Sequence, residues 1–152
     1  MNIFFCAAAE KKMFMSMFYG IFDLDEGQLH FARAGHDPAL FKRQGQDAQW
    51  LESRGMAAGL NGGVIFEKTL DSKSLELQPG DMFVIYTDGL SEAINRQGDA
   101  YSPERLAQAV NRFEGQTAQE LMDHIRLDFR THLGKVLPFD DATCVIIALT
   151  DQ

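Results

Sequence analysis

The sequence predicts an α+β fold built from antiparallel sheets. Short apolar runs bounded by turn residues come first, two amphipathic helical patterns follow, and one further apolar run lies near the end. This order lacks the strand–helix alternation that produces parallel sheets, so it favours antiparallel layers covered by helices. With 152 residues and 45% hydrophobic content, the chain is long enough for one core, and we expect residues 1–152 to form a single domain.

The first elements are a helix end and a β-hairpin. Good helix formers from Ala7 to Lys11 predict the last turns of a helix over residues 2–11. Aromatic and methionine side chains over residues 14–22 are followed by turn residues and then by alternating polarity over residues 28–34. Two such runs with a short Asp- and Gly-containing connection predict a β-hairpin.

The middle of the chain predicts further strands. Gly35 and Pro38 interrupt the second strand, and the glycine-rich residues 55–63 have the backbone freedom of a loop that passes close to another segment. A turn at Pro79 and Gly80 leads into the apolar run that begins at Met82. Extended segments are expected at residues 39–43, 49–52, 64–70 and 74–77.

Two helices are predicted late in the chain. Ser102 and Pro103 form an N-cap with proline at the first helical position. Thr117 and Glu120 have the spacing of a capping box, and Gly134 marks a C-terminal stop. Apolar residues recur at helical spacing in both segments, so each helix is expected to cover a sheet face.

Composition excludes several classes of partner. The formal net charge is −8, and Lys and Arg are not clustered, which argues against binding to nucleic acid or to an anionic membrane. No run reaches the roughly 18 apolar residues of a membrane span, and the first residues lack a basic leader. Cys6 and Cys144 lie far apart in sequence and are expected to be reduced thiols. We therefore expect a cytoplasmic protein.

Two acidic residues lie at complementary ends of predicted buried strands. Asp88 follows the apolar run 82–87, and Asp140 precedes the apolar run 142–149. If these strands pair antiparallel, the exit of one lies beside the entrance of the other, and the two carboxylates meet at one sheet edge. Close carboxylates repel each other unless a cation lies between them, and oxygen ligands suit Mg²⁺ or Mn²⁺. Asp88 and Asp140 are therefore candidate metal ligands.

Five separated segments together resemble a known family. They are residues 13–20 (MFMSMFYG), 34–38 (AGHDP), 77–81 (LQPGD), 86–93 (YTDGLSEA) and 140–143 (DDAT). In order and spacing they are similar to the bacterial protein phosphatase 2C-like domains of the stage II sporulation protein E and RsbU type, over nearly the whole chain. The resemblance implies a four-layer αββα fold, in which an antiparallel β-sandwich is flanked by helices.

The resemblance also implies a metal-dependent serine/threonine phosphatase. Its Thr-Asp-Gly and Asp-Asp motifs place metal ligands at Asp88 and Asp140, with Gly89, Asp141 and His36 around them. Two Mn²⁺ or Mg²⁺ ions would activate a water for attack on phosphoserine or phosphothreonine, so no side chain is expected to act as the nucleophile.

Family analogy extends to the partners. It implies an upstream sensor or receiver domain, and a phosphoprotein substrate such as an anti-sigma-factor antagonist. The family's earlier motifs, a Gly-Asp acid and an Asp-Val-Ser-Gly-His-Gly-like loop, have no match in the 12 residues before Met13. We therefore expect the C-terminal part of a longer domain that is inactive by itself. Its open sheet edge would favour a homodimer.

Two alternatives remain open at this point. A phosphatase fold without its full set of metal ligands could be a catalytically inactive binding module. Asp23 and Asp25 also resemble the Asp-x-Asp motif of haloacid dehalogenase-like phosphatases, but that chemistry needs a parallel sheet, and the hairpin interpretation is favoured.

Overall fold

The computed structural model describes residues 13–61 and 63–150. The described residues form two compact units: unit 1 holds those up to Pro38 together with Leu51–Gln78, and unit 2 holds Ala39–Trp50 together with those from Pro79 onward. The predicted helix over residues 2–11 and the thiol of Cys6 lie outside the described residues. The assignment of residues 1–152 to a single domain stays a prediction.

Unit 1 contains the predicted hairpin. Strand β1 (Met17–Asp23) pairs antiparallel with β2 (Gln28–Ala34), and the register runs from Met17 opposite Ala34 to Asp23 opposite Gln28. In the turn, the Asp23 Oδ1 accepts a hydrogen bond from the Glu26 N–H over 2.9 Å. Asp23 therefore stabilises a hairpin turn in an antiparallel sheet, which contradicts the dehalogenase-like alternative.

The third strand of unit 1 is β5 (Ser72–Glu76), which pairs antiparallel with β2 and gives the order β1-β2-β5. The predicted strand over residues 64–70 is wrong, because this segment forms the short helix α2 (Val64–Thr69). Local backbone bonds hold the helix in place of cross-strand bonds, including Glu67 N–H to Gly63 O at 3.2 Å and Leu70 N–H to Phe66 O at 3.1 Å. The α2 helix buries none of its residues.

The core of unit 1 lies along β2. Leu29 and Phe31 are buried, and the Phe31 ring stacks on the Phe18 ring at a centroid distance of 5.8 Å. The glycine-rich segment passes close to the end of β2, as predicted: a Cβ on Gly55 would lie 1.8 Å from the carbonyl oxygen of Arg33. Only glycine allows this approach.

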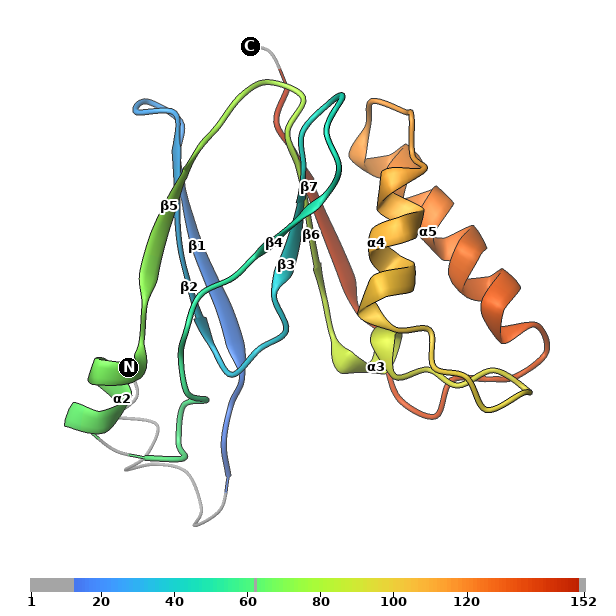
Figure 1. The fold of residues 1–152 in the computed structure, drawn as a ribbon, viewed down its shortest axis with the longest axis horizontal. Helices are drawn as coiled ribbons and strands as arrows, with labels where there is room; N and C mark the ends of the chain where they lie inside the picture. Colours follow the sequence, from blue (N-terminus) through green and yellow to red (C-terminus); the bar gives the residue numbers. More distant parts are fainter. Residues whose placement is uncertain (1–12, 62, 151–152) are drawn as a thin grey trace. The chain divides into compact units, whose positions relative to one another are not determined.

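Unit 2 contains a four-stranded antiparallel sheet in the order β4-β3-β6-β7 (Figure 1). Its central strands are β3 (Ala39–Lys42) and β6 (Met82–Tyr86). The outer strands are β4 (Gln49–Leu51), whose last residue is assigned to unit 1, and β7 (Cys144–Ala148). Four of the five residues of β6 are buried, as expected for an apolar run in the middle of a sheet.

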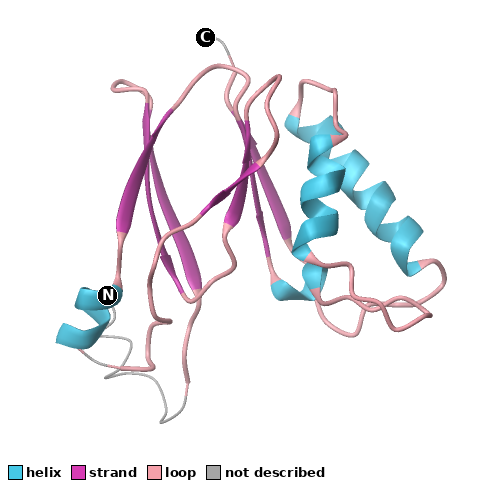
Figure 2. Ribbon diagram, viewed as in Figure 1, coloured by secondary structure: helices cyan, strands magenta, loops and turns pink. Residues whose placement is uncertain are grey.

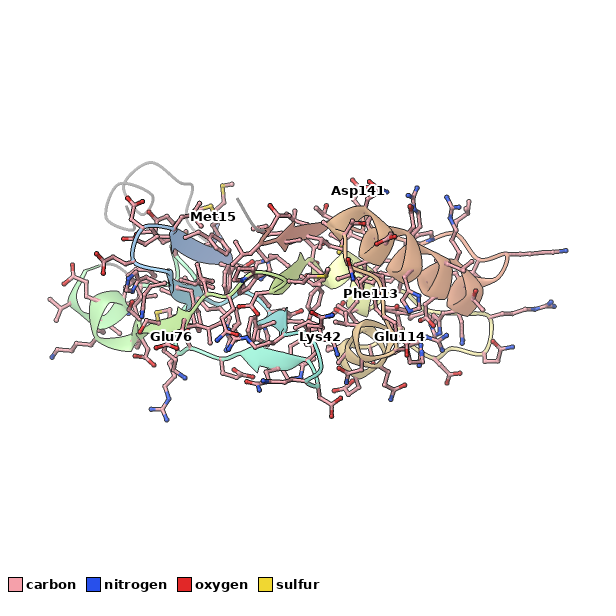
Figure 3. All side chains as sticks on the ribbon, turned by 90° about the horizontal axis from the view of Figure 1, so that it is seen from above. Met15, Lys42, Glu76, Phe113, Glu114 and Asp141 are labelled. Carbon is pink, nitrogen blue, oxygen red and sulfur yellow. The ribbon has the colours of Figure 1, made fainter. Side chains whose placement is uncertain are left out.

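Helices cover one face of this sheet (Figure 2). A short helix, α3 (Asp88–Ser91), follows β6, and the longer helices are α4 (Pro103–Asn111) and α5 (Ala118–Leu133). The predicted caps are confirmed, because the Ser102 side chain accepts from the Arg105 N–H and Thr117 and Glu120 form the capping box. Phe113, labelled in Figure 3, packs against the core that these helices share with the sheet.

The core of unit 2 combines strand and helix side chains. A buried ion pair supports the entry to β6: Asp81 is 0% exposed and accepts from Arg43 Nε at 2.8 Å and Nη2 at 2.7 Å. The buried cluster consists of Leu40, Met82, Val84, Tyr86, Leu90, Tyr101, Leu106, Val110, Leu121 and Ile125.

The prediction of an α+β fold with antiparallel sheets and helices is confirmed. Among the helices in the described part of the chain, none has both the length and the apolar character needed to cross a membrane.

Candidate metal site

The two strand ends predicted to carry metal ligands lie next to each other in unit 2. Strands β6 and β7 pair antiparallel, with Tyr86 opposite Cys144 as the last pair. The chain leaves β6 at Thr87 and enters β7 from Thr143, and the Thr87 N–H donates to the Thr143 carbonyl over 3.0 Å. The predicted antiparallel pairing of these two strands is therefore confirmed.

Thr87 holds these two segments together, a role that the sequence analysis did not assign. Its Oγ1 accepts a hydrogen bond from the Thr143 N–H over 3.0 Å and donates to the Asp141 carbonyl over 3.5 Å. One side chain at the end of β6 thus contacts two backbone positions before β7. Its place directly before Asp88 in the recognised motif was the available signal, but nothing in the sequence reveals its partners.

Gly89 allows the backbones to approach closely. A Cβ on Gly89 would lie 2.3 Å from the Asp141 carbonyl oxygen and 2.9 Å from its carbonyl carbon. Any larger residue would therefore push the segment 140–142 away from the start of α3. Gly89 sets the spacing between the segments that carry Asp88 and Asp140.

Both candidate carboxylates are exposed and each has one oxygen engaged locally. The Asp88 Oδ1 accepts from the Gly89 N–H over 2.9 Å, and the Asp140 Oδ1 accepts from the Asp141 N–H over 2.8 Å. The second oxygen of each makes no hydrogen bond within the described residues. Each carboxylate can therefore offer an oxygen to a hard cation.

The other residues predicted around the metal lie in different surroundings. Asp141, labelled in Figure 3, is exposed, and its carbonyl faces Thr87 and Gly89 as described above. His36 belongs to unit 1, where its ring Nδ1 is 2.9 Å from the Asp37 carbonyl oxygen. Arg33 Nη1 donates to the His36 carbonyl over 2.6 Å, which fixes the backbone of this loop.

These residues fit a metal ion as part of a site. Asp88 and Asp140 are hard oxygen donors of the kind that Mg²⁺ and Mn²⁺ prefer. Among residues 13–61 and 63–150, however, no group of three or more His, Cys, Asp or Glu side chains is arranged to hold a metal. The described residues thus supply two candidate ligands and not a complete set.

Cys144 lies at the start of β7, beside this site. Burial raises the pKa of its thiol to about 11, so the sulfur is protonated at neutral pH. A protonated thiol is a poor nucleophile.

Two longer proteins are similar to this chain over most of its length. Protein IcfG of Synechocystis sp. is 30% identical over 136 residues, which cover 89% of this chain and 20% of that protein. The phosphoserine phosphatase RsbU of Bacillus subtilis is 28% identical over 141 residues, which cover 91% of this chain and 40% of that protein. The chain therefore spans less than half of the length of either relative.

Solved structures show the fold. The protein phosphatase 2C (PP2C) domain of the cell fate determinant SpoIIE from Bacillus subtilis, solved with a fragment of its regulatory domain, matches with a TM-score of 0.72 at 19% identity, over 89% of this chain and 38% of that one. The catalytic domain of the serine/threonine phosphatase PstP, solved with 2 manganese ions, matches with a TM-score of 0.67 at 16% identity, over 99% of this chain and 67% of that one.

The family model that matches is that of stage II sporulation protein E, over residues 1–150. This span includes all five motif segments of the sequence analysis, and both of the strand ends that Thr87 and Gly89 hold together. The chain therefore belongs to the stage II sporulation protein E (SpoIIE) family and has a PP2C-like fold.

Proposed function

We propose that the chain forms the C-terminal part of a metal-dependent protein-serine/threonine phosphatase domain, with Asp88 and Asp140 as ligands of Mn²⁺ or Mg²⁺. The observation that carries the proposal is the antiparallel pairing of β6 with β7. With the hydrogen bond from the Thr143 N–H to Thr87 Oγ1, this pairing holds together the two segments that carry Asp88 and Asp140. The relative RsbU is a phosphoserine phosphatase, and the matching PstP structure holds manganese.

The residues at the adjoining ends of β6 and β7 have two different proposed roles. Asp88 and Asp140 would each give a carboxylate oxygen to a cation, while Thr87 and Gly89 keep the two strand ends in register. A bound divalent cation supplies charge neutralisation at the phosphoryl oxygens and lowers the pKa of a coordinated water. The remaining ligands of a two-ion site would come from outside the described residues.

The finer features of the domain belong to the same proposal. By family analogy, the two sheets would stack as a sandwich between helices, and His36 and Asp141 would lie around the metals. The substrate would be a phosphorylated regulatory protein such as an anti-sigma-factor antagonist, in the cytoplasm. An upstream sensor or receiver domain would control the activity, and two copies would associate as a homodimer.

A second candidate is a phosphatase-fold binding module without catalysis. It is favoured by the absence, among the described residues, of a group of three potential metal ligands. Such a module would bind a phosphoprotein partner without hydrolysing it.

The experiment measures hydrolysis of p-nitrophenyl phosphate and of a phosphoserine peptide by the full-length natural protein, after EDTA and after added Mn²⁺. We expect activity only with Mn²⁺. Asp88→Asn and Asp140→Asn are each expected to lower kcat/KM by about a hundredfold or more, because each removes a charged ligand. Calorimetric Mn²⁺ titration gives a second readout, in which both variants bind the ion more weakly.

Asp47→Asn is the matched control, since Asp47 is an exposed aspartate before β4 with no side-chain partner among the described residues. Wild-type activity in Asp88→Asn and Asp140→Asn would refute the proposed ligands. An inactive natural protein that fails to take up Mn²⁺ would instead support the binding module.

A further inference from the structure

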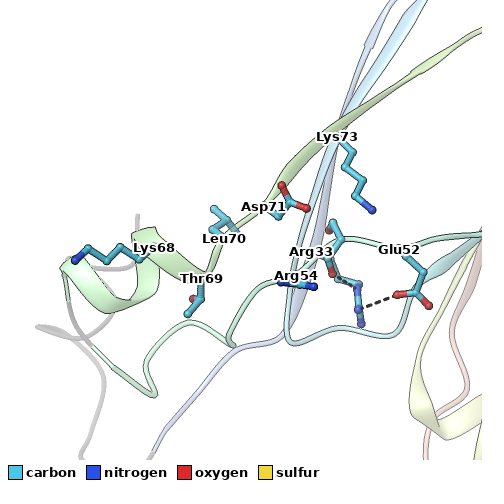
Figure 4. A pocket seen from close by; sticks show the side chains of 9 residues that line it. Arg33, Glu52, Arg54, Lys68, Thr69, Leu70, Asp71 and Lys73 are labelled. Carbon is cyan, nitrogen blue, oxygen red and sulfur yellow. Dashed lines mark hydrogen bonds and ion pairs between the residues drawn. The ribbon is translucent and has the colours of Figure 1, made fainter.

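Unit 1 contains an open, polar pocket with a volume of about 560 Å³ (Figure 4). All of its lining residues belong to unit 1. They come from the end of β2, from residues 52–54 after β4, from the end of α2 with the two residues that follow it, and from β5. Two hydrogen bonds build it: Arg33 Nε donates to the Ser53 carbonyl over 3.2 Å, and the Asp71 N–H donates to the Arg54 carbonyl over 2.8 Å. The lining residues are Arg33, Glu52, Ser53, Arg54, Lys68, Thr69, Leu70, Asp71 and Lys73.

The pocket is positively charged in an acidic chain. Four of its side chains are basic and two are acidic, whereas the whole chain has a net charge of −8. Arg33 is already engaged, because it donates to Glu52 at 3.3 Å and to backbone carbonyls. The remaining basic side chains are therefore the ones available to a ligand.

Arg54 and Lys73 are two further basic residues of the pocket lining. Both are exposed, and neither side chain makes a hydrogen bond or ion pair within the described part of the chain. In Figure 4 they project into the same part of the pocket as Arg33, while Lys68 extends from α2 farther away. An anion bound here would accept hydrogen bonds from the guanidinium group of Arg54 and from the ammonium group of Lys73.

Ser53 provides a second, independent indication of a ligand. The residue is 3% exposed and lines the pocket, yet its Oγ has no hydrogen-bond partner among the described residues. A buried hydroxyl without a partner is costly, so such groups in folded proteins call for an explanation. An acceptor oxygen of a ligand in the pocket would satisfy it once the Ser53 side chain turns toward the pocket.

We infer that this pocket binds a phosphate group. The lining is almost entirely polar, with Leu70 as its apolar member, so the pocket does not suit an apolar organic ligand. Phosphate combines the negative charge that Arg54 and Lys73 would neutralise with the acceptor oxygens that the Ser53 hydroxyl lacks. The phosphate can be free or carried by a peptide, and this inference does not depend on the proposed phosphatase activity.

The test titrates inorganic phosphate and, separately, a phosphoserine peptide into the full chain by calorimetry, with EDTA present so that a metal site cannot contribute. We expect the Arg54→Gln/Lys73→Gln double variant to bind phosphate about tenfold more weakly than wild type, since two charge-assisted hydrogen bonds are removed. Ser53→Ala should also weaken binding. In the wild type, the backbone amide NMR signals of residues 52–54 and 68–73 should shift on titration.

The control is Arg130→Gln/Lys135→Gln, which removes the same two charges at exposed positions of unit 2 and should bind as wild type does. A loss in both titrations assigns recognition to the phosphate itself, and a loss in the peptide titration alone assigns it to phosphate on a protein chain. The inference fails if wild type binds neither ligand, if both double variants lose affinity equally, or if the shifted amides lie elsewhere. Asp88→Asn should bind phosphate as wild type does, because Asp88 lies in unit 2 and not in the pocket. A failure of the phosphate inference can therefore be distinguished from a failure of the proposed metal site.

Discussion

At the scale of single residues, Gly89 tests whether the close approach of two backbones builds the candidate metal site. A methyl group at this position would lie 2.3 Å from the Asp141 carbonyl oxygen, and backbone atoms cannot turn aside as a side-chain tip can. We expect Gly89→Ala to lower the free energy of unfolding by about 1–3 kcal/mol, the usual range for inserting a methyl into a packed place. Urea unfolding measures this change.

The same variant should weaken Mn²⁺ binding, because displacement of the segment 140–142 separates Asp140 from Asp88. Gly20→Ala is a control of the same chemistry, since the nearest atom to its added Cβ would be a Leu29 side-chain atom at 3.3 Å, which can move. Wild-type stability and Mn²⁺ affinity in Gly89→Ala would show that the spacing of these backbones does not matter.

Single residues also mark the limit of prediction from the sequence. Asp88 and Asp140 could be chosen as candidates because each carboxylate follows or precedes an apolar run, which is a local signal. The tasks of Thr87 and Ser53 could not be predicted. The hydrogen-bond partners of Thr87 lie more than fifty residues away in the sequence. The Ser53 hydroxyl is notable only because it is buried without a hydrogen-bond partner among the described residues, which the sequence does not reveal.

At the scale of elements, one aspartate on α5 forms ion pairs with two arginines at α4 and its C-terminal end. Asp128 on α5 accepts from Arg105 Nε at 2.9 Å and from Arg112 Nη2 at 3.0 Å. Burial alone raises the pKa of the Asp128 carboxyl, but its interactions with Arg105, Tyr101 and Arg112 together outweigh burial and hold the pKa below its usual value. A lower pKa in the folded state means that ionised Asp128 stabilises the fold.

This stabilisation is fully present above the unfolded pKa of about 3.9 and is lost as the pH falls through the folded value. We expect Asp128→Asn to lower the free energy of unfolding by about 1 kcal/mol at neutral pH, because both arginines are partly exposed. The difference from wild type should begin to shrink as the pH falls below about 4 and should disappear once the pH lies below the folded pKa of Asp128. Urea unfolding over a pH series measures it, and Asp47→Asn should show little effect. A difference that is constant in acid would contradict the assigned charge effect.

Elements with strong local signals were predicted well, and one with a misleading signal was not. The caps at Ser102 and Thr117 are short-range patterns that the sequence carries completely, and both helices begin there. Val64, Ile65 and Phe66 have the composition of a strand, yet they form α2. This segment closes its backbone hydrogen bonds locally instead, because strand propensity depends on tertiary context that the local sequence does not contain.

At the scale of the whole molecule, the pairing of strands far apart in the sequence was predictable only where functional residues marked the strand ends. Two acids at complementary strand ends suggested the pairing of β6 with β7, whose last pair joins Tyr86 to Cys144, far apart in the sequence. The pairing of β2 with β5 had no such marker. The full set of metal ligands could not be predicted either. Two acids indicate which edge of the sheet would hold a cation, but they do not indicate how many oxygen ligands would coordinate it.

The distribution of buried side chains predicts unequal local stability across the chain. The buried cluster of ten residues lies entirely in unit 2, and β6 is hydrogen-bonded to a strand on each side. In unit 1, α2 buries none of its residues, and four of the five residues of β5 are exposed. Amide exchange through local opening should therefore cost much less free energy in α2 and β5 than in β6.

Hydrogen exchange measured by NMR on the isolated chain should show this gradient. Amides of β6 are expected to exchange at least about a hundredfold more slowly than those of α2, because their release requires opening of the unit 2 core. Phosphate bound in the pocket of unit 1 should slow exchange in α2 and β5 selectively, since a ligand stabilises the segments that hold it. Equal protection of α2 and β6 without ligand would mean that α2 is stabilised by contacts other than those of the described residues.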